Sequence, residues 1–297
     1  MGSAIARNLL DRGYTVSVWN IDRGMMAGVV DAGATAFEKL ESLVESVDVV
    51  IAMLWDDEVA REISLGRIIP VARKGQLVIE SSTLSPQMYE QLAQAAARRG
   101  VDFLACPVIG SVDGARTGAL TLFPGGSSEA FGRGRELLSA MGSAVTFTGS
   151  PTASGHVKLA SNCMLAVLAE SIGELLGTMG RAGVDRTIAV DTLVYMLQRV
   201  ATKHQQLIER DTRPRFSAGA LVKDLRLAHA ARQRLNVNAP LVDLASAEFE
   251  RAVKTGLDDE DYIAVALALD RNIGSNEDPR GAGHASRTPK DQPPVEL

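Results

Sequence analysis

The sequence predicts an α/β fold, in which a doubly wound, mostly parallel sheet is followed by an all-α domain. In residues 1–150, short β-branched and apolar runs alternate with helix-like stretches. After Gly149 these runs stop and helical periodicity continues alone. Strands that alternate with helices need crossover connections, which produce parallel sheets covered by helices on both faces. We therefore predict a first domain over residues 1–150 and a second over residues 151–273.

Six runs predict the strands of the first domain. They are 15–20, 48–54, 76–83, 101–108, 119–126 and 144–149. The run DVVIAML at 48–54 is almost continuously apolar, as expected of a strand that is buried on both faces of a parallel sheet. Ser85 and Pro86 predict a helix start, because serine caps helices and proline favours their first position.

The second domain is predicted to begin with one long helix over residues 154–183, where apolar residues recur at helical spacing. Shorter helices are predicted at 186–210, 217–235, 240–255 and 259–270. Residues 274–297 are rich in proline, glycine and charge and have almost nothing to bury, so they predict a disordered tail.

The composition excludes several classes of function. A net charge of -5 over 297 residues argues against a nucleic-acid partner, because a phosphate backbone calls for a basic face. No run of 18 or more apolar residues occurs, so we expect no membrane span. Without a signal-peptide pattern, and with only two cysteines, we expect a cytoplasmic protein. Four scattered histidines predict no metal site.

The first residues fit an incomplete nucleotide-binding unit. Doubly wound domains that bind dinucleotides open with a strand and the fingerprint G-x-G-x-x-G, which leads into a helix. The segment MGSAIARNLLDRG looks like the last glycine of that fingerprint and its helix, with Gly2 as the third glycine. The first strand and the two glycines that approach the pyrophosphate are missing, so we expect the native chain to begin upstream. The prediction is a Rossmann-type sheet that lacks its first strand.

The segment WNIDR, at the end of the predicted second strand, bears on the choice of cofactor. An acidic residue there accepts hydrogen bonds from the ribose 2′-OH of NAD, whereas an arginine accommodates the 2′-phosphate of NADP. Asn20 does not distinguish NAD from NADP, whereas Asp22 favours NAD and Arg23 favours NADP. The charged side chains of Asp22 and Arg23 would also suit a solvated turn without any cofactor contact. We predict Asn20 and Arg23 as cofactor contacts and leave NAD or NADP open.

Three further segments carry a resemblance. They are CPVIGSVDGARTGALTLFPGG at 106–126, SGHVKLASN at 154–162 and RFSAGALVKDLRLA at 215–228. In their order and spacing they resemble the β-hydroxyacid dehydrogenase family, which includes 3-hydroxyisobutyrate dehydrogenase, tartronate semialdehyde reductase and, more distantly, 6-phosphogluconate dehydrogenase. The resemblance covers about residues 1–270.

The resemblance implies a substrate site in the first of these segments. Its glycines would let backbone N–H groups approach a substrate carboxylate, with Gly110 and Ser111 as the residues that hold it. The sequence departs from the family at Ile109, where the family has a serine. That departure leaves the identity of the substrate open.

The second segment places Lys158 and Asn162 four residues apart, hence on one face of a helix. Hydride transfer at a carbinol carbon requires a proton to move on the attached oxygen, and a lysine with a lowered pKa can move it. The resemblance implies that Lys158 is the general acid or base and that Asn162 holds the substrate oxygen or orients the lysine.

The remaining candidates follow from the resemblance alone. Lys223 is implied to reach the substrate and the nicotinamide, with Asp224 supporting it. Met53 and Leu54, after a buried strand, and Thr83, in ESSTLSP, are implied cofactor contacts.

Three functions remain open from the sequence. The first is an NAD(P)-dependent dehydrogenase or reductase that interconverts a small β-hydroxy acid and its carbonyl partner. The second is an imine reductase-like enzyme, which Ile109 favours, and the third is a non-catalytic dinucleotide-binding protein. A homodimer or larger assembly is expected, because the helix at 154–183 has more apolar surface than a small α-domain can bury.

Overall fold

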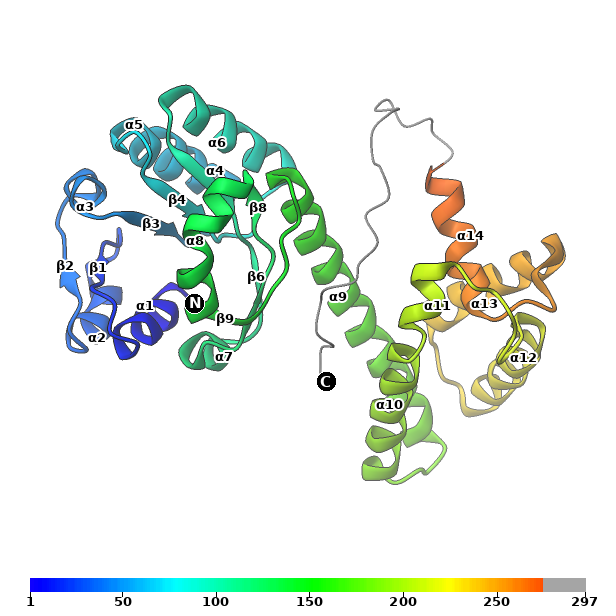
Figure 1. Ribbon diagram of the computed structural model, residues 1–297. Helices are drawn as coiled ribbons and strands as arrows, with labels where there is room; N and C mark the ends of the chain where they lie inside the picture. Colours follow the sequence, from blue (N-terminus) through cyan, green and yellow to red (C-terminus); the bar gives the residue numbers. More distant parts are fainter. Residues whose placement is uncertain (275–297) are drawn as a thin grey trace. The chain divides into compact units, whose positions relative to one another are not determined.

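The computed structural model describes residues 1–274 and divides into two compact units, Met1–Ala166 and Val167–Leu297 (Figure 1). The first unit is α/β and the described part of the second is helical. The division falls inside one long helix rather than at the predicted residue 150. The predicted tail lies outside the described residues, except for Gly274, which ends the last helix.

The strands of the first unit form three ladders. The strands are β1 (Ser17–Val18), β2 (Thr35–Ala36), β3 (Val49–Ala52), β4 (Leu77–Glu80), β5 (Asp102–Ala105), β6 (Val108–Ile109), β7 (Leu120–Leu122), β8 (Gly125–Gly126) and β9 (Gly142–Val145). β1 pairs with β2 in parallel, and β3, β4 and β5 form a parallel sheet that β8 extends antiparallel. β6 pairs antiparallel with β7, which pairs in parallel with β9.

The predicted strands are confirmed as elements, but several boundaries were wrong. The run at 101–108 divides into β5 and β6, with Pro107 between them, and the run at 119–126 divides into β7 and β8, with Pro124 between them. A proline has no N–H to donate to a ladder, so it interrupts pairing. β9 begins two residues before the predicted run at 144–149, and β2 was not predicted because two residues carry no periodic signal.

The helices of the first unit cover both faces of this sheet. They are α1 (Gly2–Asp11), η1 (Arg23–Met26), α2 (Ala27–Val30), α3 (Leu40–Ser46), α4 (Asp57–Ala60), η2 (Arg61–Ile68), α5 (Ile69–Val71), α6 (Pro86–Arg99), α7 (Val112–Thr117) and α8 (Ser128–Met141). Val78 belongs to the apolar cluster that includes Leu92 of α6, whereas Leu77 belongs to the cluster that includes Leu138 of α8. Successive side chains of β4 therefore pack into apolar clusters on opposite faces of the sheet, and the predicted doubly wound fold is confirmed.

The sheet is interrupted between β1 and β3. Within the described residues, β1 pairs only with β2, and β3 pairs only with β4. In the common doubly wound order, strand 1 lies between strand 2 and strand 4. If β1 and β3 are taken as strands 2 and 4 of that order, the interruption falls at the position of strand 1.

The helices of the second unit begin with the end of α9 (Pro151–Arg181). They continue as α10 (Arg186–Ala201), α11 (His204–Glu209), α12 (Ala218–Leu235), α13 (Pro240–Ala252), η3 (Val253–Leu257) and α14 (Ile263–Gly274). The helix predicted at 186–210 is thus two helices, α10 and α11. The Glu174 carboxylate of α9 accepts hydrogen bonds from the N–H groups of Leu241 and Val242 and so caps the first turn of α13.

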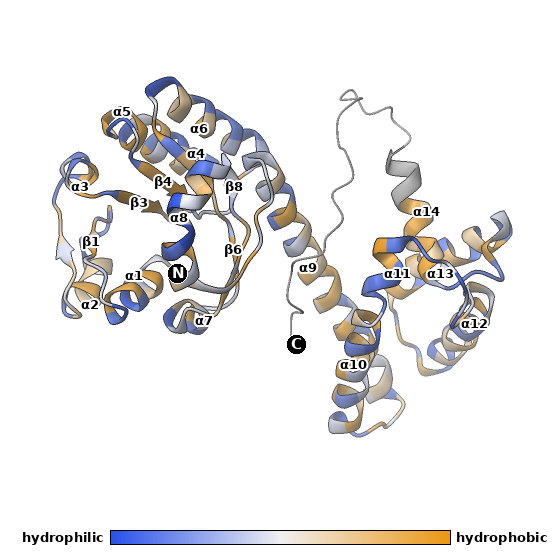
Figure 2. Cartoon of the chain, viewed as in Figure 1, coloured by the Kyte–Doolittle hydropathy of each residue, from blue (hydrophilic) through white to orange (hydrophobic). Residues whose placement is uncertain are grey.

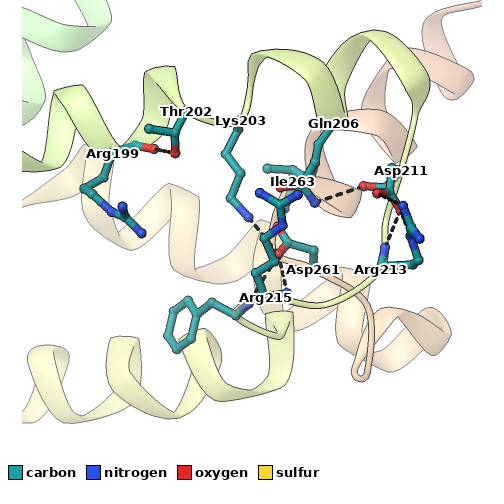
Figure 3. A network of polar contacts seen from close by, with 10 residues as sticks. Arg199, Thr202, Lys203, Gln206, Asp211, Arg213, Arg215, Asp261 and Ile263 are labelled. Atoms are coloured by element: carbon teal, nitrogen blue, oxygen red, sulfur yellow. Dashed lines mark hydrogen bonds and ion pairs between the residues drawn. The ribbon is translucent and has the colours of Figure 1, made fainter.

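A buried ion pair ties three segments of the second unit together (Figure 3). Lys203 Nζ lies 2.8 Å from Asp261 Oδ2, and both side chains are almost fully buried. The same carboxylate accepts from the N–H groups of Arg215 and Phe216, just before α12, and from the N–H of Ile263 at the start of α14. The pair therefore fixes the loop that leads into α12.

The helix α9 has the length and composition to cross a membrane, with a mean hydropathy of 1.4 in its most apolar stretch. Apolar residues lie along it in Figure 2. The sequence predicted no membrane span because it contains no unbroken run of 18 apolar residues. Glu170 and Glu174 break such a run in α9, but the mean hydropathy of the surrounding stretch stays high. Glu174 is bonded to α13 of the same unit, which suits a structural helix of a folded domain.

Candidate active site

The loops at the carboxyl ends of β3 and β4 form the centre of the predicted cofactor site. Ligands of open parallel sheets bind outside the carboxyl ends of the strands. Met53 and Leu54 follow β3, and Thr83 follows β4. The Leu54 N–H donates to Ser82 Oγ at 2.6 Å, so the structure brings Leu54 next to the segment that carries Thr83. Thr83 is exposed, whereas Ser82 beside it is fully buried.

The beginning of α1 lies against the same loop. A Cβ atom built on Gly2 would lie 3.5 Å from Met53 Cβ, so the two predicted cofactor contacts are neighbours. The first turn of α1 holds no acidic residue and has no side-chain cap. An uncapped helix N-terminus favours a negative group such as a pyrophosphate.

These residues fit the nicotinamide and ribose end of a dinucleotide. Ser81, two residues before Thr83, is buried, and its hydroxyl has no hydrogen-bond partner among the described residues. Such an orphaned donor at a strand end suits a bound polar ligand.

The turn after β1 holds Asn20 and Arg23. The Asn20 side chain accepts from the N–H of Asp22 at 2.9 Å, and Asp22 in turn caps η1 by accepting from the N–H of Gly24. Arg23 is exposed and lies 3.3 Å from Glu38. The Asp22 carboxylate already accepts a hydrogen bond within the turn, and Arg23 forms an ion pair that is exposed to solvent. Neither residue therefore decides between NAD and NADP.

The glycines of the predicted substrate stretch have another role. A Cβ on Gly125 would overlap the carbonyl oxygen of Ser150, and one on Gly126 would lie 2.5 Å from the carbonyl oxygen of Phe103. Both positions thus require glycine because the protein's own backbone lies against them. These two glycines therefore have a packing role, and the predicted carboxylate holders remain Gly110 and Ser111.

Gly110 and Ser111, the predicted carboxylate holders, lie at the exposed turn between β6 and α7. Gly110 has a φ of 142°, and a Cβ there would lie 2.8 Å from Leu120 Cδ2. Ser111 caps α7 by accepting from the N–H of Gly114 at 3.1 Å, which leaves its hydroxyl hydrogen free to donate. Ile109, the departure from the family pattern, lies half-buried on β6.

Lys158 lies on α9 within the first unit and is half-buried. Burial lowers the pKa of its amine from the ordinary value. Its Nζ has no ion pair or hydrogen bond within the part of the chain that the structure describes. Asn162 lies one turn further along and is exposed. The lysine is therefore shifted toward the neutral form that can accept a proton.

The first turns of α9 are packed tightly on the rest of the first unit. A Cβ on Gly155 would lie 3.1 Å from both Pro86 Cα and Tyr89 Cδ2 of α6. Tyr89 is fully buried, and its hydroxyl donates to the carbonyl oxygen of Ser82. The helix that carries Lys158 is thus anchored to the segment that carries Thr83. The sequence did not single out Tyr89 or Ser82.

Lys223 lies in the second unit, on α12, where it is exposed and 3.1 Å from Asp224. An exposed pair of neighbouring charges also suits a solvated helix face, so the supporting role of Asp224 stays a prediction. The predicted contact of Lys223 with substrate and nicotinamide stays a prediction. Among residues 1–274, no group of three or more His, Cys, Asp or Glu side chains is arranged to hold a metal ion.

The fold and this site together define a class, the dinucleotide-dependent oxidoreductases in which a doubly wound cofactor domain precedes an all-α domain. Residues 1–149 match the family model described as the NAD binding domain of 6-phosphogluconate dehydrogenase. Residues 153–269 match the one described as NAD-binding of NADP-dependent 3-hydroxyisobutyrate dehydrogenase. The chain belongs to the β-hydroxyacid dehydrogenase family and is an NAD(P)-dependent oxidoreductase.

Individual relatives agree with this assignment. The chain is 30% identical over 291 residues to an NAD-dependent L-serine dehydrogenase of Pseudomonas aeruginosa, covering 92% of this chain and 96% of the relative. It is similar in structure to a 3-hydroxyisobutyrate dehydrogenase of Mycobacterium tuberculosis, with a TM-score of 0.61, 26% identity and coverage of 91% and 95%. An imine reductase from Pseudomonas sp. shares the fold, with a TM-score of 0.79, 20% identity and coverage of 91% and 96%.

Proposed function

We propose that the protein catalyses reversible hydride transfer between NAD(P) and a small β-hydroxy acid, with Lys158 as the general acid and base. The observation that carries the proposal is the state of Lys158. Its amine is half-buried on α9, has a lowered pKa and lacks a carboxylate partner within the described residues. A structural lysine would gain from such a partner, whereas a proton-transfer group is better without one.

The bound nicotinamide supplies the hydride acceptor in oxidation and the hydride donor in reduction. In the oxidation direction, neutral Lys158 accepts the proton of the substrate hydroxyl as the carbonyl forms. In the reduction direction, the protonated amine returns it to the carbonyl oxygen. Asn162, one turn away on the same helix face, is proposed to hold that oxygen by donating from its amide.

The substrate class rests on relatives and on one turn of this chain. Two relatives are named as acting on L-serine and on 3-hydroxyisobutyrate, both small hydroxy acids. Gly110 and Ser111 offer backbone N–H groups and a hydroxyl that can donate to a carboxylate. Ile109 removes the hydroxyl that the family pattern has there, so the side of the substrate that faces β6 is proposed to be apolar.

Imine reduction is the second candidate, and Ile109 is the observation that favours it. An apolar residue in place of a serine suits substrates that lack a carboxylate. Lys158 favours the hydroxy acid. Family membership weighs against the third possibility, a non-catalytic dinucleotide-binding protein.

The test is a steady-state assay with small β-hydroxy acids, each with NAD and NADP, followed by nicotinamide absorbance. Lys158→Ala is expected to lower kcat by about 10²-fold or more, while dinucleotide affinity changes less than about twofold. Lys158→Arg keeps the positive charge but cannot release a proton, so it should lose as much activity. An Arg variant that retains most activity would overturn the acid–base role.

The lowered pKa of Lys158 gives a second test. In the oxidation direction the neutral amine is the active form, so kcat/KM should rise with pH until Lys158 is deprotonated and then level off below its ordinary value. A profile that continues to rise to the ordinary lysine pKa would contradict the assignment.

The interruption between β1 and β3 supports a further proposal, that a strand and the G-x-G turn precede α1 in the native chain. Each of the two strands has an unpaired edge within the described residues, and in the common doubly wound order a parallel strand that leads into α1 would pair with both edges. NADH and NADPH titrations should give clearly tighter binding for a chain extended upstream than for residues 1–297. Equal affinities would contradict the proposal.

A homodimer is proposed from surface chemistry, and a location in the cytoplasm is proposed from the low cysteine count. Large apolar side chains on α9 and α10 are at least half exposed, among them Met164, Leu165, Ile188 and Tyr195. Apolar surface on this scale favours a protein partner. Light scattering that gives the mass of one chain at micromolar concentration would overturn the dimer, and fractionation of cells tests the compartment.

A further inference from the structure

A buried carboxyl group lies under the predicted cofactor loops and has no part in the proposed hydride transfer. Glu80 ends β4 with a fully buried side chain. Its Oε2 accepts from the Ser64 hydroxyl of η2 at 2.5 Å, and its Oε1 accepts from the hydroxyl and the N–H of Ser82. Burial raises the pKa of this carboxyl, and the hydrogen bonds oppose that shift. No cation pairs with it among residues 1–274.

Ser82 links this carboxyl to the cofactor loop. Its hydroxyl oxygen accepts a hydrogen bond from the N–H of Leu54 at 2.6 Å, and its hydroxyl group donates a hydrogen bond to Glu80. Its carbonyl oxygen accepts from the Tyr89 hydroxyl. One side chain therefore joins the end of β3 to the end of β4, two strands whose loops are separated by 28 residues in the chain. Loop positions set by a buried polar network are held more rigidly than by apolar contact alone.

A second polar bridge joins the same two loops further out. Asp57, in the first turn of α4, accepts from both the N–H and the hydroxyl of Ser85, the N-cap of α6. Leu54 and Asp57 lie where the chain passes from β3 into α4, while Ser82 and Ser85 lie where it passes from β4 into α6. The exposed Thr83 stands between the two anchored serines. This arrangement leaves the segments 54–57 and 82–85 little freedom to move apart.

We infer that Glu80 and Ser82 are positioning residues for the dinucleotide: they hold Met53 and Leu54 in register with Thr83, so that the nicotinamide end is bound by loops fixed in advance. The inference deepens the proposed function and rests on it for the identity of the ligand. Loops fixed before binding lose less conformational entropy when the ligand arrives, which raises affinity. Neither residue touches the reacting atoms in this inference.

The test compares Ser82→Ala with Ser64→Ala. Each variant removes one hydroxyl donor from the same buried carboxyl, so each should lose the stability that comes from that hydrogen bond. Only Ser82→Ala also leaves the N–H of Leu54 without an acceptor. Hydrogen–deuterium exchange over residues 53–57 should become about fivefold faster in Ser82→Ala and stay unchanged in Ser64→Ala.

Binding of NADH and NADPH gives the second readout. We expect Ser82→Ala to raise the dinucleotide Kd by about fivefold and to leave kcat at saturating cofactor within about twofold, whereas Ser64→Ala leaves both unchanged. Glu80→Gln keeps an oxygen that can accept from Ser82, so this variant should retain most of the wild-type affinity.

Failure of the positioning role and failure of the proposed function give different results. Equal exchange and equal Kd in Ser82→Ala and Ser64→Ala would overturn the positioning role while leaving the oxidoreductase intact. A wild-type protein that binds neither dinucleotide would contradict the proposed function. The exchange comparison would in that case still decide whether Ser82 holds the loop.

Discussion

The two units of the chain bury their apolar residues very differently. All of the largest fully buried side chains, such as Tyr89, Leu104 and Met141, lie in the first unit. The apolar cluster of the second unit centres on Ala218, Ala252 and Val265. Large side chains of its helices, Ile188 and Tyr195 of α10 among them, remain 61% and 58% exposed.

This difference indicates where each unit finds its stability. The first unit has a sheet covered on both faces, so burial of large side chains stabilises it within one chain. The described part of the second buries fewer large apolar side chains, among them Ile263 and Leu267, and polar contacts such as the Lys203–Asp261 pair also connect its segments. Its exposed apolar side chains need a partner to become buried.

The largest effect is expected at the buried ion pair of the second unit. Asp261→Asn leaves Lys203 buried without a counter-charge and should cost about 3 kcal/mol in the free energy of unfolding. Asp211→Asn is the matched control in the same network, because Asp211 pairs with the exposed Arg213 (Figure 3). Chemical denaturation measures both, and equal losses would contradict the special role of Asp261.

The same pair predicts a dependence on pH. Burial alone would raise the pKa of Asp261, but Lys203 and the N–H groups of Arg215, Ile263 and Phe216 hold it below its ordinary value. Since the pKa is lower in the folded chain, this stabilisation is present above about pH 4 and is lost as the pH falls through the folded pKa. The difference between wild type and Asp261→Asn should therefore shrink in acid.

The next effect tests the tightness of the first unit. Gly125→Ala places a Cβ against the backbone oxygen of Ser150, which cannot rotate away, and should cost about 2 kcal/mol. Because Ser150 directly precedes α9, the change should also disturb the helix that carries Lys158. A melting temperature equal to that of wild type would show that this packing is looser than the structure indicates.

Substitutions of exposed apolar residues should weaken association between copies more in the second unit than in the first. In Ile188→Glu with Tyr195→Glu, charges replace two exposed apolar residues of α10 and should weaken the proposed dimer by about tenfold. Ile21→Glu is the control, because Ile21 is 81% exposed in the first unit. Sedimentation at several concentrations distinguishes them, and a dimer that tolerates both changes does not use this face of α10.

The sequence predicted the fold class well, because its signals are local. Runs such as 48–54 and 76–83 are apolar and β-branched, and they became β3 and β4. Prolines 107 and 124 could have indicated where two of the runs divide. The two-residue β2 carries no periodic pattern, and it forms because β1 offers an unpaired edge.

In the candidate site, too, local motifs could be predicted from the sequence and contacts between distant segments could not. Lys158 could be nominated from the sequence because its motif is local, and its half-buried position and lowered pKa suit the proposed acid–base role. Glu80, Ser82 and Tyr89 were missed because their roles depend on contacts across the chain, such as that between Ser82 and Leu54. One signal was available: a glutamate at the end of the apolar run LVIE is costly to bury unless donors meet it.

The smallest expected changes in the free energy of unfolding come from two glycine-to-alanine substitutions, one in each unit, and these changes are opposite in sign. Gly134 of α8 and Gly177 of α9 are both inside helices, where alanine is intrinsically favoured by about 0.5–1 kcal/mol. A Cβ on Gly134 would lie 3.3 Å from Leu77 and Leu104, so overpacking should outweigh that gain. Nothing lies within 4 Å of a Cβ on Gly177, so Gly177→Ala should stabilise the chain. Unfolding free energies of the two variants, measured with the association state held fixed, test the comparison. If Gly177→Ala instead weakened association, that glycine would lie in the interface between copies, and the unpartnered surface of the second unit would extend along α9.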